Sequence, residues 1–390
     1  MSIREIRLPA DLKPALLSGH PWIYRDHIPP NTYLKNGSWV RVSAGNVAAY
    51  GIWDAHGPIA VRLFSRHTIP DIAWVEARVR EAWDVRAPLR ARGDTNAYRW
   101  LYGESDGLPG IVVDLYDRHA ILRTYTDSVR KLVPWVVAAL RRVAPVDGIA
   151  ERQEDEFGEP RWHVHWGQRP PDELVVLENG WHMYANLLHG QKTGLFLDQR
   201  ENRRELMRWC GGKRVLNCFA YNGGFSLAAA LGGARFVESV DVAANALEDA
   251  RRTFALNGLD PDAHAFTRAD VFDLLEQYAR EGRTFDVVVL DPPSFARSKN
   301  QRHKAIRAYT RLNALALNLI PPGGLLVSSS CTAQVSHADF LNMLATAAAK
   351  AGRRLRILHD AGQPLDHPVP PHFPEGRYLK FVIAHVADVA

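Results

Sequence analysis

The sequence has few cysteines, and their arrangement suggests neither a disulfide framework nor a structural zinc site. Only Cys210, Cys218 and Cys331 occur in 390 residues, and no two of them form a Cys-x-x-Cys pair. A sparse, odd-numbered set in a large chain is typical of a reducing compartment. We therefore expect a cytoplasmic protein without cross-links and without a bound metal.

Long apolar runs are also missing. No uninterrupted apolar stretch approaches the about 20 residues that span a bilayer, so we expect no membrane partner. The charged N-terminal stretch MSIREIRLPADLKPALL lacks the apolar core of a signal peptide. The phosphate-binding pattern G-x-x-x-x-G-K-[ST] is absent, which disfavours nucleoside triphosphate chemistry.

Length and charge set the class of protein. Apolar residues make up 46% of the sequence and charged residues 23%, as in folded soluble proteins. A chain of 390 residues is too long for one core, so two or three domains are expected. The net charge of +5 permits a polyanionic partner without establishing one.

Residues 1–70 predict a small β-rich domain. Apolar and polar residues alternate in SWVRVSA, NVAAYGIWD and IAVRLFSR, which are separated by Asn, Gly and His turns. Short strands with basic residues suit a small RNA-binding barrel, although a sandwich of another function would look alike. Trp22 and Tyr24 could stack on bases, but such aromatics more often fill a small core.

Residues 71–180 predict a central α+β domain. The stretch DIAWVEARVREAWDVRAPLRARG has helical periodicity and predicts a linking helix. A turn and hairpin are expected in GESDGLPGIVVDLYDRHAILRTYT, followed by an amphipathic helix in SVRKLVPWVVAALRRV. No catalytic constellation is found in this region.

Residues 181–390 alternate regularly between strand and helix patterns, which predicts a doubly wound, mostly parallel sheet. Sheets of this kind bind ligands at the carboxyl ends of their strands. All candidate functional residues fall at predicted strand ends, namely Asn217 to Gly224, Asp241, Asp270, Asp291 and Cys331. This coincidence is the strongest indication of an active site that the residues themselves provide.

The stretch VLNCFAYNGGFSLAAALGGARFVESVD, residues 215–241, predicts a cofactor-binding βαβ unit. A strand ends in the turn at Gly223-Gly224, and a second strand ends at Asp241, a carboxylate suited to ribose hydroxyls. Asp270 could position an adenine amine through itself or through the adjacent Val271 and Phe272, with a helix N-cap as an equal alternative for Asp270.

Asp291-Pro292-Pro293-Ser294-Phe295 follows the predicted strand FDVVVL. Two prolines fix an extended, rigid turn. An acid at this place can hydrogen-bond the edge of a nucleobase, and Phe295 can stack on it. Beside a cofactor site, the turn indicates group transfer onto a base.

Cys331 ends the next predicted strand. Such a cysteine is usually an inert small hydrophobe, as we expect for Cys210 and Cys218. Cys331 would instead face the same crevice as Asp291, where its thiolate could add to carbon 6 of a pyrimidine and make carbon 5 nucleophilic.

Two basic stretches flank these elements. The first is a helix opening in DQRENRREL, with Asp198 near its cap and Arg200, Arg203, Arg204 and Arg208 along one flank. The second follows the proline turn and contains Arg297, Lys299, Arg302, Lys304, Arg307 and Arg311. Each is either a solvated helix face or a phosphate-binding surface, and we favour phosphate contact for the second.

Several segments together resemble one family, the bacterial class I S-adenosylmethionine-dependent methyltransferases that act on carbon 5 of cytosine in 23S ribosomal RNA and carry a PUA domain. These segments are KTGLFLDQRENR, VLNCFAYNGGFSLAAA, SVDVAANAL, VVLDPPSFARSK, LLVSSSC and HPVPPHFPEGRYLKF, with GHPWIY resembling the PUA domain and GESDGLPGIVVDLY the central one. The resemblance covers nearly the whole chain. It implies a PUA-like RNA-binding β-barrel at 1–70, an α+β domain at 71–180 and a Rossmann-like methyltransferase domain with a seven-stranded sheet at 181–390.

The resemblance also implies roles for individual residues. Asn217, Phe219, Tyr221, Gly223 and Gly224 would cradle S-adenosylmethionine, with Asp241 on the ribose, Asp270 and Val271 at the adenine, and Asp291 on the crevice floor. Lys192, Thr193 and Gly194, with Asp198 and Arg200, would close over the cofactor. Cys331 matches the catalytic nucleophile, and the residues expected to contact RNA are Arg203, Phe295, Arg297, Lys299, Arg302 and Lys304.

One departure from the pattern is visible. Many RNA cytosine-5 methyltransferases carry a second cysteine after the proline turn, where this chain has Ser294. The base that removes the carbon-5 proton therefore stays open between Asp291 and water.

Two other functions are weighed beside this one. An enzyme of the same fold could methylate a base nitrogen, with Cys331 a spectator, and an RNA-binding assembly factor could keep a vestigial methyltransferase domain. The sequence does not indicate which nucleotide is modified. It also leaves open whether the substrate is naked RNA or a ribosomal-subunit intermediate, and whether the protein is a homodimer or a monomer.

Overall fold

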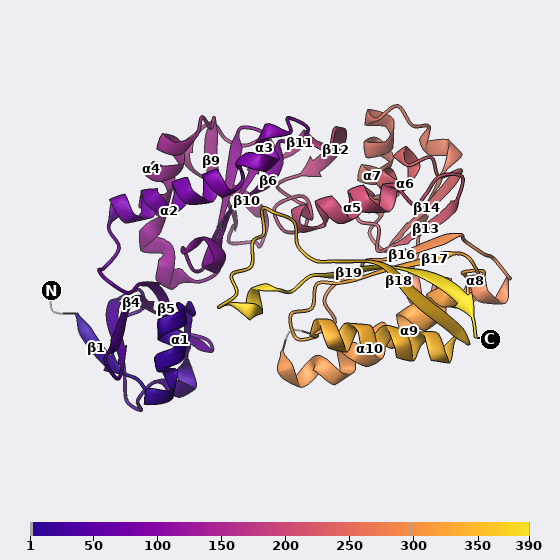
Figure 1. Cartoon of the computed structure of the whole chain (residues 1–390). Coiled ribbons are helices and arrows are strands. Elements are labelled where there is room, and N and C mark those ends of the chain that lie inside the picture. Colours follow the sequence, from indigo (N-terminus) through magenta and orange to yellow (C-terminus); the bar gives the residue numbers. More distant parts are fainter. Residues whose placement is uncertain (1–2, 297, 390) are drawn as a thin grey trace. The chain divides into compact units, whose positions relative to one another are not determined.

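The structure is a computed structural model that describes residues 3–296 and 298–389 (Figure 1). The chain forms two compact units. Unit 1 contains the chain up to Val176 together with Asn186–Leu197 and Leu365–Gly376. Unit 2 contains Leu177–Ala185, Asp198–Pro364 and the chain from Arg377 onward. The predicted domain boundaries at residues 70 and 180 stay a prediction.

Unit 1 begins with a five-stranded sheet of order β1-β3-β4-β5-β2, in which only β1 and β3 pair in parallel. Its elements are β1 (Arg4–Arg7), α1 (Lys13–Ser18), β2 (Trp22–Tyr24), β3 (Trp39–Ala44), β4 (Val47–Trp53) and β5 (Ile59–Ser65). Burial alternates along β3, where Val40, Val42 and Ala44 enter the core. The period-two pattern in the sequence therefore predicted β3, β4 and β5 correctly.

The second sheet of unit 1 has the order β10-β9-β8-β7-β6, with one parallel pair, β8 and β9. Its strands are β6 (Ala97–Tyr102), β7 (Ile111–Tyr116), β8 (His119–Thr124), β9 (Gly148–Glu154) and β10 (Pro160–Gly167). Three helices accompany it, α2 (Ile72–Val85), α3 (Ala87–Ala91) and α4 (Val133–Val143). The expected hairpin and amphipathic helix are thus present as β7–β8 and α4.

The linking helix expected at residues 71–95 is present between β5 and β6, but it is not continuous. The segment forms two helices, and the inner face of α2 places Val75, Val79 and Ala82 in the core of the second sheet. The break comes at Arg86, after which Pro88 stands in the first turn of α3. Arg86 is fully buried, and its guanidinium binds both carboxylate oxygens of Asp106 at 2.8 and 2.7 Å.

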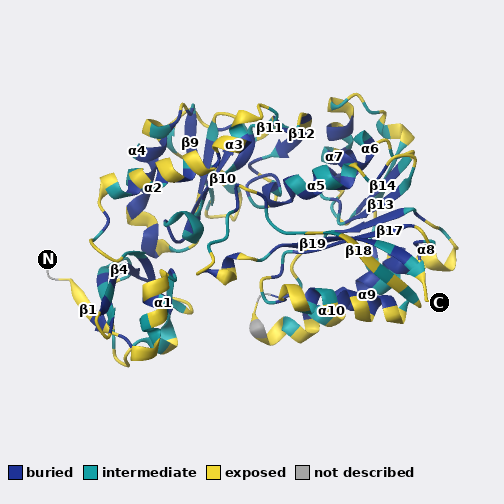
Figure 2. Cartoon of the chain, viewed as in Figure 1, coloured by how far each residue is buried: buried dark blue, intermediate teal, exposed yellow. Residues whose placement is uncertain are grey.

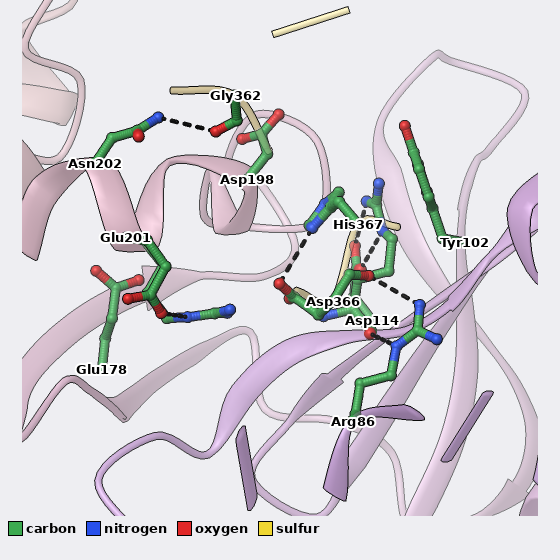
Figure 3. A network of polar contacts seen from close by, with 12 residues as sticks. Arg86, Tyr102, Asp114, Glu178, Asp198, Glu201, Asn202, Gly362, Asp366 and His367 are labelled. Carbon is green, nitrogen blue, oxygen red and sulfur yellow. Dashed lines mark hydrogen bonds and ion pairs between the residues drawn. The ribbon is translucent and has the colours of Figure 1, made fainter. Parts of the chain in front are cut away.

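The late segment Leu365–Gly376 completes unit 1. Asp366 accepts a hydrogen bond from the main-chain nitrogen of Arg99 at 2.9 Å through its carboxylate, and another from Arg86 at 2.9 Å through its carbonyl (Figure 3). Phe373 packs edge-on against Trp22, with ring centroids 4.7 Å apart. Trp22 therefore packs inside the protein, which was the more common of its two expected roles.

Unit 2 contains a seven-stranded sheet of order β15-β14-β13-β16-β17-β19-β18. All neighbours are parallel except β19, which runs antiparallel to both β17 and β18. The strands are β13 (Arg214–Cys218), β14 (Phe236–Asp241), β15 (Ala265–Arg268), β16 (Val287–Leu290), β17 (Leu325–Ser330), β18 (Arg353–Ala361) and β19 (Lys380–Asp388). The predicted seven-stranded, mostly parallel sheet is confirmed.

Helices cover both faces of this sheet (Figure 1). One face carries α8 (Val271–Arg280), α9 (Arg302–Leu317) and α10 (His337–Lys350), whose apolar residues join the largest core. The other carries α5 (Arg200–Met207), α6 (Gly224–Leu231) and α7 (Ala244–Leu256). All four residues of β16 are buried, as expected for a central parallel strand covered on both faces (Figure 2).

Two further strands, β11 (Glu173–Glu178) and β12 (Trp181–Asn186), form a two-stranded sheet of their own. Among the described residues, no helix combines the length and the apolar character needed to cross a bilayer.

Candidate functional site

The turn between β13 and α6 has a strained backbone. Phe219 and Tyr221 have positive φ angles of 60° and 49°, which residues with a side chain rarely adopt. Gly223, with φ 78°, caps the start of α6. Strain of this kind costs free energy and clusters at functional sites. The turn holds the main chain at the N-terminal end of α6 in an unusual conformation, at the place the sequence predicted for a cofactor.

The two glycines of this turn are required by close packing. A Cβ atom on Gly223 would lie 2.7 Å from the Cβ atom of Ala250 in α7. A Cβ atom on Gly224 would lie 2.9 Å from Cδ of Arg203 in α5. Both distances are shorter than carbon atoms tolerate, so the glycines allow α6 to approach its two neighbouring helices.

Asp241, the last residue of β14, is hydrogen-bonded to the turn. Its Oδ2 accepts a hydrogen bond from the main-chain nitrogen of Tyr221 at 2.9 Å, and its Oδ1 accepts one from Ala243 at 2.9 Å. A carboxylate oxygen can accept more than one hydrogen bond. Asp241 therefore keeps acceptor capacity on both oxygens for a pair of ribose hydroxyls.

Asn217 is buried in β13 and links the strand to α6. Its Nδ2 donates to Oγ of Ser226 at 2.9 Å, and that hydroxyl also accepts from Ser239 at 2.7 Å. Among the described residues, Oδ1 of Asn217 has no hydrogen-bond partner although it is buried. Such an acceptor is costly to leave unpaired, so a bound donor at this end of β13 would be favourable.

Asp270 is the N-cap of α8. Its Oδ1 accepts hydrogen bonds from the main-chain nitrogens of Phe272 at 2.8 Å and Asp273 at 3.3 Å. The N-cap alternative is therefore observed, and Val271 beside it is buried. Contact of either residue with adenine stays a prediction.

Asp291 directly follows β16, and a glutamine that the sequence reasoning missed fixes it. Nε2 of Gln199 donates to Oδ1 of Asp291 at 2.9 Å and to Oγ of Ser329 at 2.9 Å. Gln199 thereby connects the ends of two neighbouring strands, β16 and β17. Its place in the segment DQRENR, between two predicted residues, was the signal that could have identified it.

Cys331 directly follows β17 and is half-buried, whereas Cys210 and Cys218 are buried. Burial raises the pKa of the Cys210 thiol to about 12 and also raises that of Cys218. These two cysteines are therefore inert structural residues, as predicted. Cys331 alone is a partly accessible thiol at the carboxyl ends of the strands.

Three hydroxyl groups are linked at Thr332, the residue after Cys331. The Tyr309 hydroxyl lies 2.7 Å from Oγ1 of Thr332, which lies 3.0 Å from Oγ of Ser294. Burial, with smaller contributions from the charges of Cys331 and Asp291, raises the pKa of Tyr309 to about 12. Tyr309 is therefore neutral and shares one electrostatic environment with both predicted catalytic residues.

A buried lysine lies next to the same place. Lys380 is 2% exposed, and its Nζ donates to the carbonyl oxygens of Thr332 and Tyr378, both at 2.7 Å. Burial lowers the pKa of Lys380 to about 8. The sequence signal was a single lysine in the apolar run YLKFVIAHV. The neighbouring Tyr378 donates its hydroxyl to Oδ2 of Asp198 at 2.5 Å.

Two arginines of the first basic stretch are buried, whereas Arg204 is half-buried and Arg208 is exposed. Arg200 is fully buried and Arg203 is 4% exposed, with both partly bound by acids, Arg200 by Glu201 and Arg203 by Glu178. Neither is a solvated helix face, and the burial of Arg203 argues against the predicted phosphate contact. Nearby, Nδ2 of Asn202 reaches the carbonyl of Gly362 at 3.4 Å (Figure 3).

The second basic stretch is more accessible. Lys304 is exposed on α9, whereas Arg302 forms an ion pair with Asp339 at 2.5 Å. Phe295 is half-buried and packs against Tyr309, with ring centroids 4.6 Å apart. Arg297 and the side chain of Lys299 lie outside what the structure describes.

Lys192, Thr193 and Gly194 belong to unit 1. Oγ1 of Thr193 donates to Oδ2 of Asp114 at 2.6 Å, and Nζ of Lys192 lies 4.3 Å from the centre of the Phe196 ring. Lys192 and Thr193 line a pocket of about 420 Å³ in unit 1. The predicted contact of these residues with a cofactor stays a prediction.

The strand ends of unit 2 thus form two groups with different chemistry. Around β13 and β14, a strained turn, a helix N-terminus and the Asp241 carboxylate suit a nucleoside-containing cofactor. Around β16 and β17, Asp291, Cys331 and Lys380 bring a carboxylate, a thiol and an ammonium together, which suits nucleophilic chemistry on a polar ring.

Comparisons with known proteins show which family the chain belongs to. A family model described as S-adenosylmethionine-dependent methyltransferase matches residues 159–375, and a PUA-like domain model matches residues 6–66. The chain is 37% identical to a ribosomal RNA large subunit methyltransferase I of Aeromonas salmonicida, over 95% of this chain and 96% of the relative. It is 40% identical to a ribosomal RNA large subunit methyltransferase of Deinococcus radiodurans, over 93% of each chain.

Solved structures show the same architecture. A protein of Streptococcus mutans described as a SAM-dependent methyltransferase superposes with a TM-score of 0.86 at 25% identity, covering 98% of this chain and all of the other. A methyltransferase structure in complex with SAH superposes with a TM-score of 0.87 at 26% identity, with the same coverage.

Proposed function

Because the chain belongs to the S-adenosylmethionine-dependent methyltransferase family and carries an N-terminal PUA-like domain, we propose that it methylates carbon 5 of a cytosine in 23S ribosomal RNA. Family membership confirms the predicted class I methyltransferase fold, the family that the motifs resemble and S-adenosylmethionine as the cofactor. The base and the atom that receive the methyl group are the proposed part.

Relatives and domains support ribosomal RNA as the substrate. Both relatives are named as methyltransferases of large-subunit ribosomal RNA, and each covers more than nine-tenths of this chain. A PUA-like domain and the exposed Lys304 on α9 suit an RNA partner.

The residues at β13 and β14 fit the cofactor. The strained turn at Phe219 and Tyr221 brings the main chain to the N-terminal end of α6, and Asp241 has acceptor capacity for ribose hydroxyls. Asn217, Gly223 and Gly224 hold this turn in place. When bound, S-adenosylmethionine supplies an electrophilic methyl group.

Cys331 and Asp291 then act on the base. The Cys331 thiolate forms a bond to carbon 6 of cytosine, and the displaced electron pair makes carbon 5 nucleophilic. After carbon 5 is methylated, its proton leaves to Asp291 or to water, and the carbon–sulfur bond breaks with its electron pair returning to Cys331. As a hydrogen-bond acceptor, Asp291 would also bind the polar edge of the ring.

One observation carries the proposal. Of the three cysteines, only Cys331 is not buried, and it follows β17, the sheet neighbour of the strand that Asp291 follows. A thiol and a carboxylate at adjacent parallel strand ends meet the geometric need of carbon-5 chemistry.

The test uses RNA that contains 5-fluorocytidine, in which the carbon-5 proton is replaced and the enzyme stays covalently attached. We expect wild type to form an adduct that survives denaturing gel electrophoresis, and Cys331→Ala to form none while it still binds S-adenosylmethionine in calorimetry. Cys210→Ala, which removes a buried thiol away from the strand ends, should form the adduct normally. Full methylation by Cys331→Ala would overturn the covalent mechanism.

Nucleoside mass spectrometry of the product separates the alternatives. 5-Methylcytidine is expected, whereas a base methylated on nitrogen would favour the enzyme in which Cys331 is a spectator. A chain that fails to bind S-adenosylmethionine would instead support the assembly factor.

A further inference from the structure

Lys380 is held next to the proposed nucleophile by the register of the sheet. It begins β19 and pairs with Ser330 of β17, the residue before Cys331. Its ammonium group extends to the carbonyl oxygen of Thr332, the residue after Cys331. The main chain on both sides of Cys331 is therefore in contact with Lys380.

The surroundings of Lys380 lack an obvious counter-ion. Within the described part of the chain, no carboxylate lies at ion-pair distance from its Nζ, which binds two carbonyl oxygens instead. Burial lowers its pKa to about 8, and the charges that oppose this change belong to Cys331 and Asp339. Asp339 already binds Arg302 and Ser336.

A lysine with this pKa is still mostly protonated at pH 7. A buried ammonium group is costly unless a negative charge lies near it. Because Asp339 is occupied, the group that can best supply that charge is the sulfur of Cys331.

We propose that the Lys380 ammonium stabilises Cys331 as a thiolate, so that Lys380 is a positioning residue for the nucleophile. The inference rests on the proposed function for the role of Cys331 as nucleophile. Cys331 loses its proton to solvent, and Lys380 keeps all of its protons. When the carbon–sulfur bond breaks at the end of the reaction, the electron pair returns to a sulfur that again faces the ammonium group.

The experiment measures the rate at which iodoacetamide alkylates Cys331 in the folded protein across pH, followed by peptide mass spectrometry. Cys210 and Cys218 are buried and serve as unreactive internal references. In wild type we expect a thiolate midpoint below the about 8.5 of a free cysteine. In Lys380→Gln, which keeps a donor for the carbonyls but loses the charge, the midpoint should rise and alkylation at pH 7 should slow by about tenfold.

Lys380→Arg keeps the charge and should keep the midpoint near that of wild type. An unchanged pH profile in Lys380→Gln, or a profile of Lys380→Arg that matches Lys380→Gln, would overturn the inference. If Lys380→Gln does not fold, the wild-type profile is sufficient as a test: a thiolate midpoint of Cys331 at or above about 8.5 would overturn the inference. The alkylation assay contains no RNA, so a negative result in it bears only on Lys380. Failure to form the 5-fluorocytidine adduct is a different result, and it would overturn the proposed function.

Discussion

Arg203 and Glu178 form a buried ion pair in which two guanidinium nitrogens bind both carboxylate oxygens, at 2.7 and 2.6 Å. Glu178 ends β11 and is fully buried, and Arg203 lies in α5 beside the glycine turn. The pair therefore joins the end of β11 to α5, the helix that packs against α6.

Removal of Arg203 should destabilise the protein strongly, because Glu178 would be left as a buried charge without a partner. For Arg203→Ala we expect a loss of about 3–5 kcal/mol in the free energy of unfolding, measured with urea. Arg208→Ala, at the end of the same helix, removes an exposed arginine and should cost less than about 1 kcal/mol. Equal losses in the two variants would contradict the structural role of the pair.

Lys304→Ala tests the RNA surface on α9. Because one phosphate contact is lost, the slope of log affinity against log salt should decrease by about 1, with stability unchanged. Lys350→Ala makes the same charge change at the exposed end of α10 and should leave the slope unaltered. If the two variants bind alike at every salt concentration, the RNA does not contact this part of α9.

Asp241→Asn tests the cofactor-binding turn. An asparagine amide cannot accept hydrogen bonds at both ends, so either Tyr221 or Ala243 would face a donor. We expect S-adenosylmethionine to bind at least about tenfold more weakly in calorimetry. Asp262→Asn, an equivalent change at an exposed aspartate, should bind as wild type does; unaltered affinity in Asp241→Asn would remove this residue from the site.

Two glycine variants separate packing from backbone strain. Gly223 and Gly258 have similar positive φ angles of 78° and 71°, but an added Cβ atom meets Ala250 only at Gly223 and open space at Gly258. Gly258→Ala should therefore cost about 1 kcal/mol in unfolding free energy, and Gly223→Ala about 1–3 kcal/mol more. A common melting temperature for both variants would show that α6 and α7 can separate without cost.

Glu151 in unit 1 should make stability depend on pH in acid. Burial alone would raise the pKa of Glu151, but the His165 ring 3.7 Å away and hydrogen bonds from Gln153 and Arg130 lower it to about 2. A depressed folded-state pKa gives stability above the ordinary value of 4.5, and this stability is lost as the pH falls towards 2. Urea denaturation of Glu151→Gln should show a deficit at pH 7 that shrinks at pH 3, and a constant deficit would contradict this.

Residues at strand ends could be predicted because periodicity defines where strands stop. Asp241 ends β14, and Asp291 and Cys331 directly follow β16 and β17, as the alternation of apolar strands and amphipathic helices indicated. In a parallel sheet the carboxyl ends lie on one edge, so position along the chain was enough to bring these residues together.

Long-range pairs could not be predicted in this way. Lys380 lies beside Ser330 and Thr332, the neighbours of Cys331, only because of the register of β19 against β17. The sequence of an antiparallel strand does not indicate which strand it pairs with. The same holds for Gln199 with Asp291 and for Arg203 with Glu178, whose polar side chains in the sequence are equally typical of solvent. The hydrophobic pattern also could not show that α2 packs in a core, because an amphipathic linking helix has the same spacing of apolar residues.

Leu365–Gly376 has a consequence for the order in which the protein is completed during translation. The chain passes from one unit to the other after Val176, Ala185, Leu197, Pro364 and Gly376. Asp366, which binds Arg86 and Arg99, therefore leaves the ribosome after most of unit 2 has been made. The strands of both sheets of unit 1 are made before residue 170, whereas the last segment of unit 1 is made only after residue 364. Strand β19, which begins at Lys380, comes directly after that segment in the sequence. A nascent chain that stops before residue 365 lacks both, so unit 1 has its last segment and the seven-stranded sheet has β19 only after these residues are made.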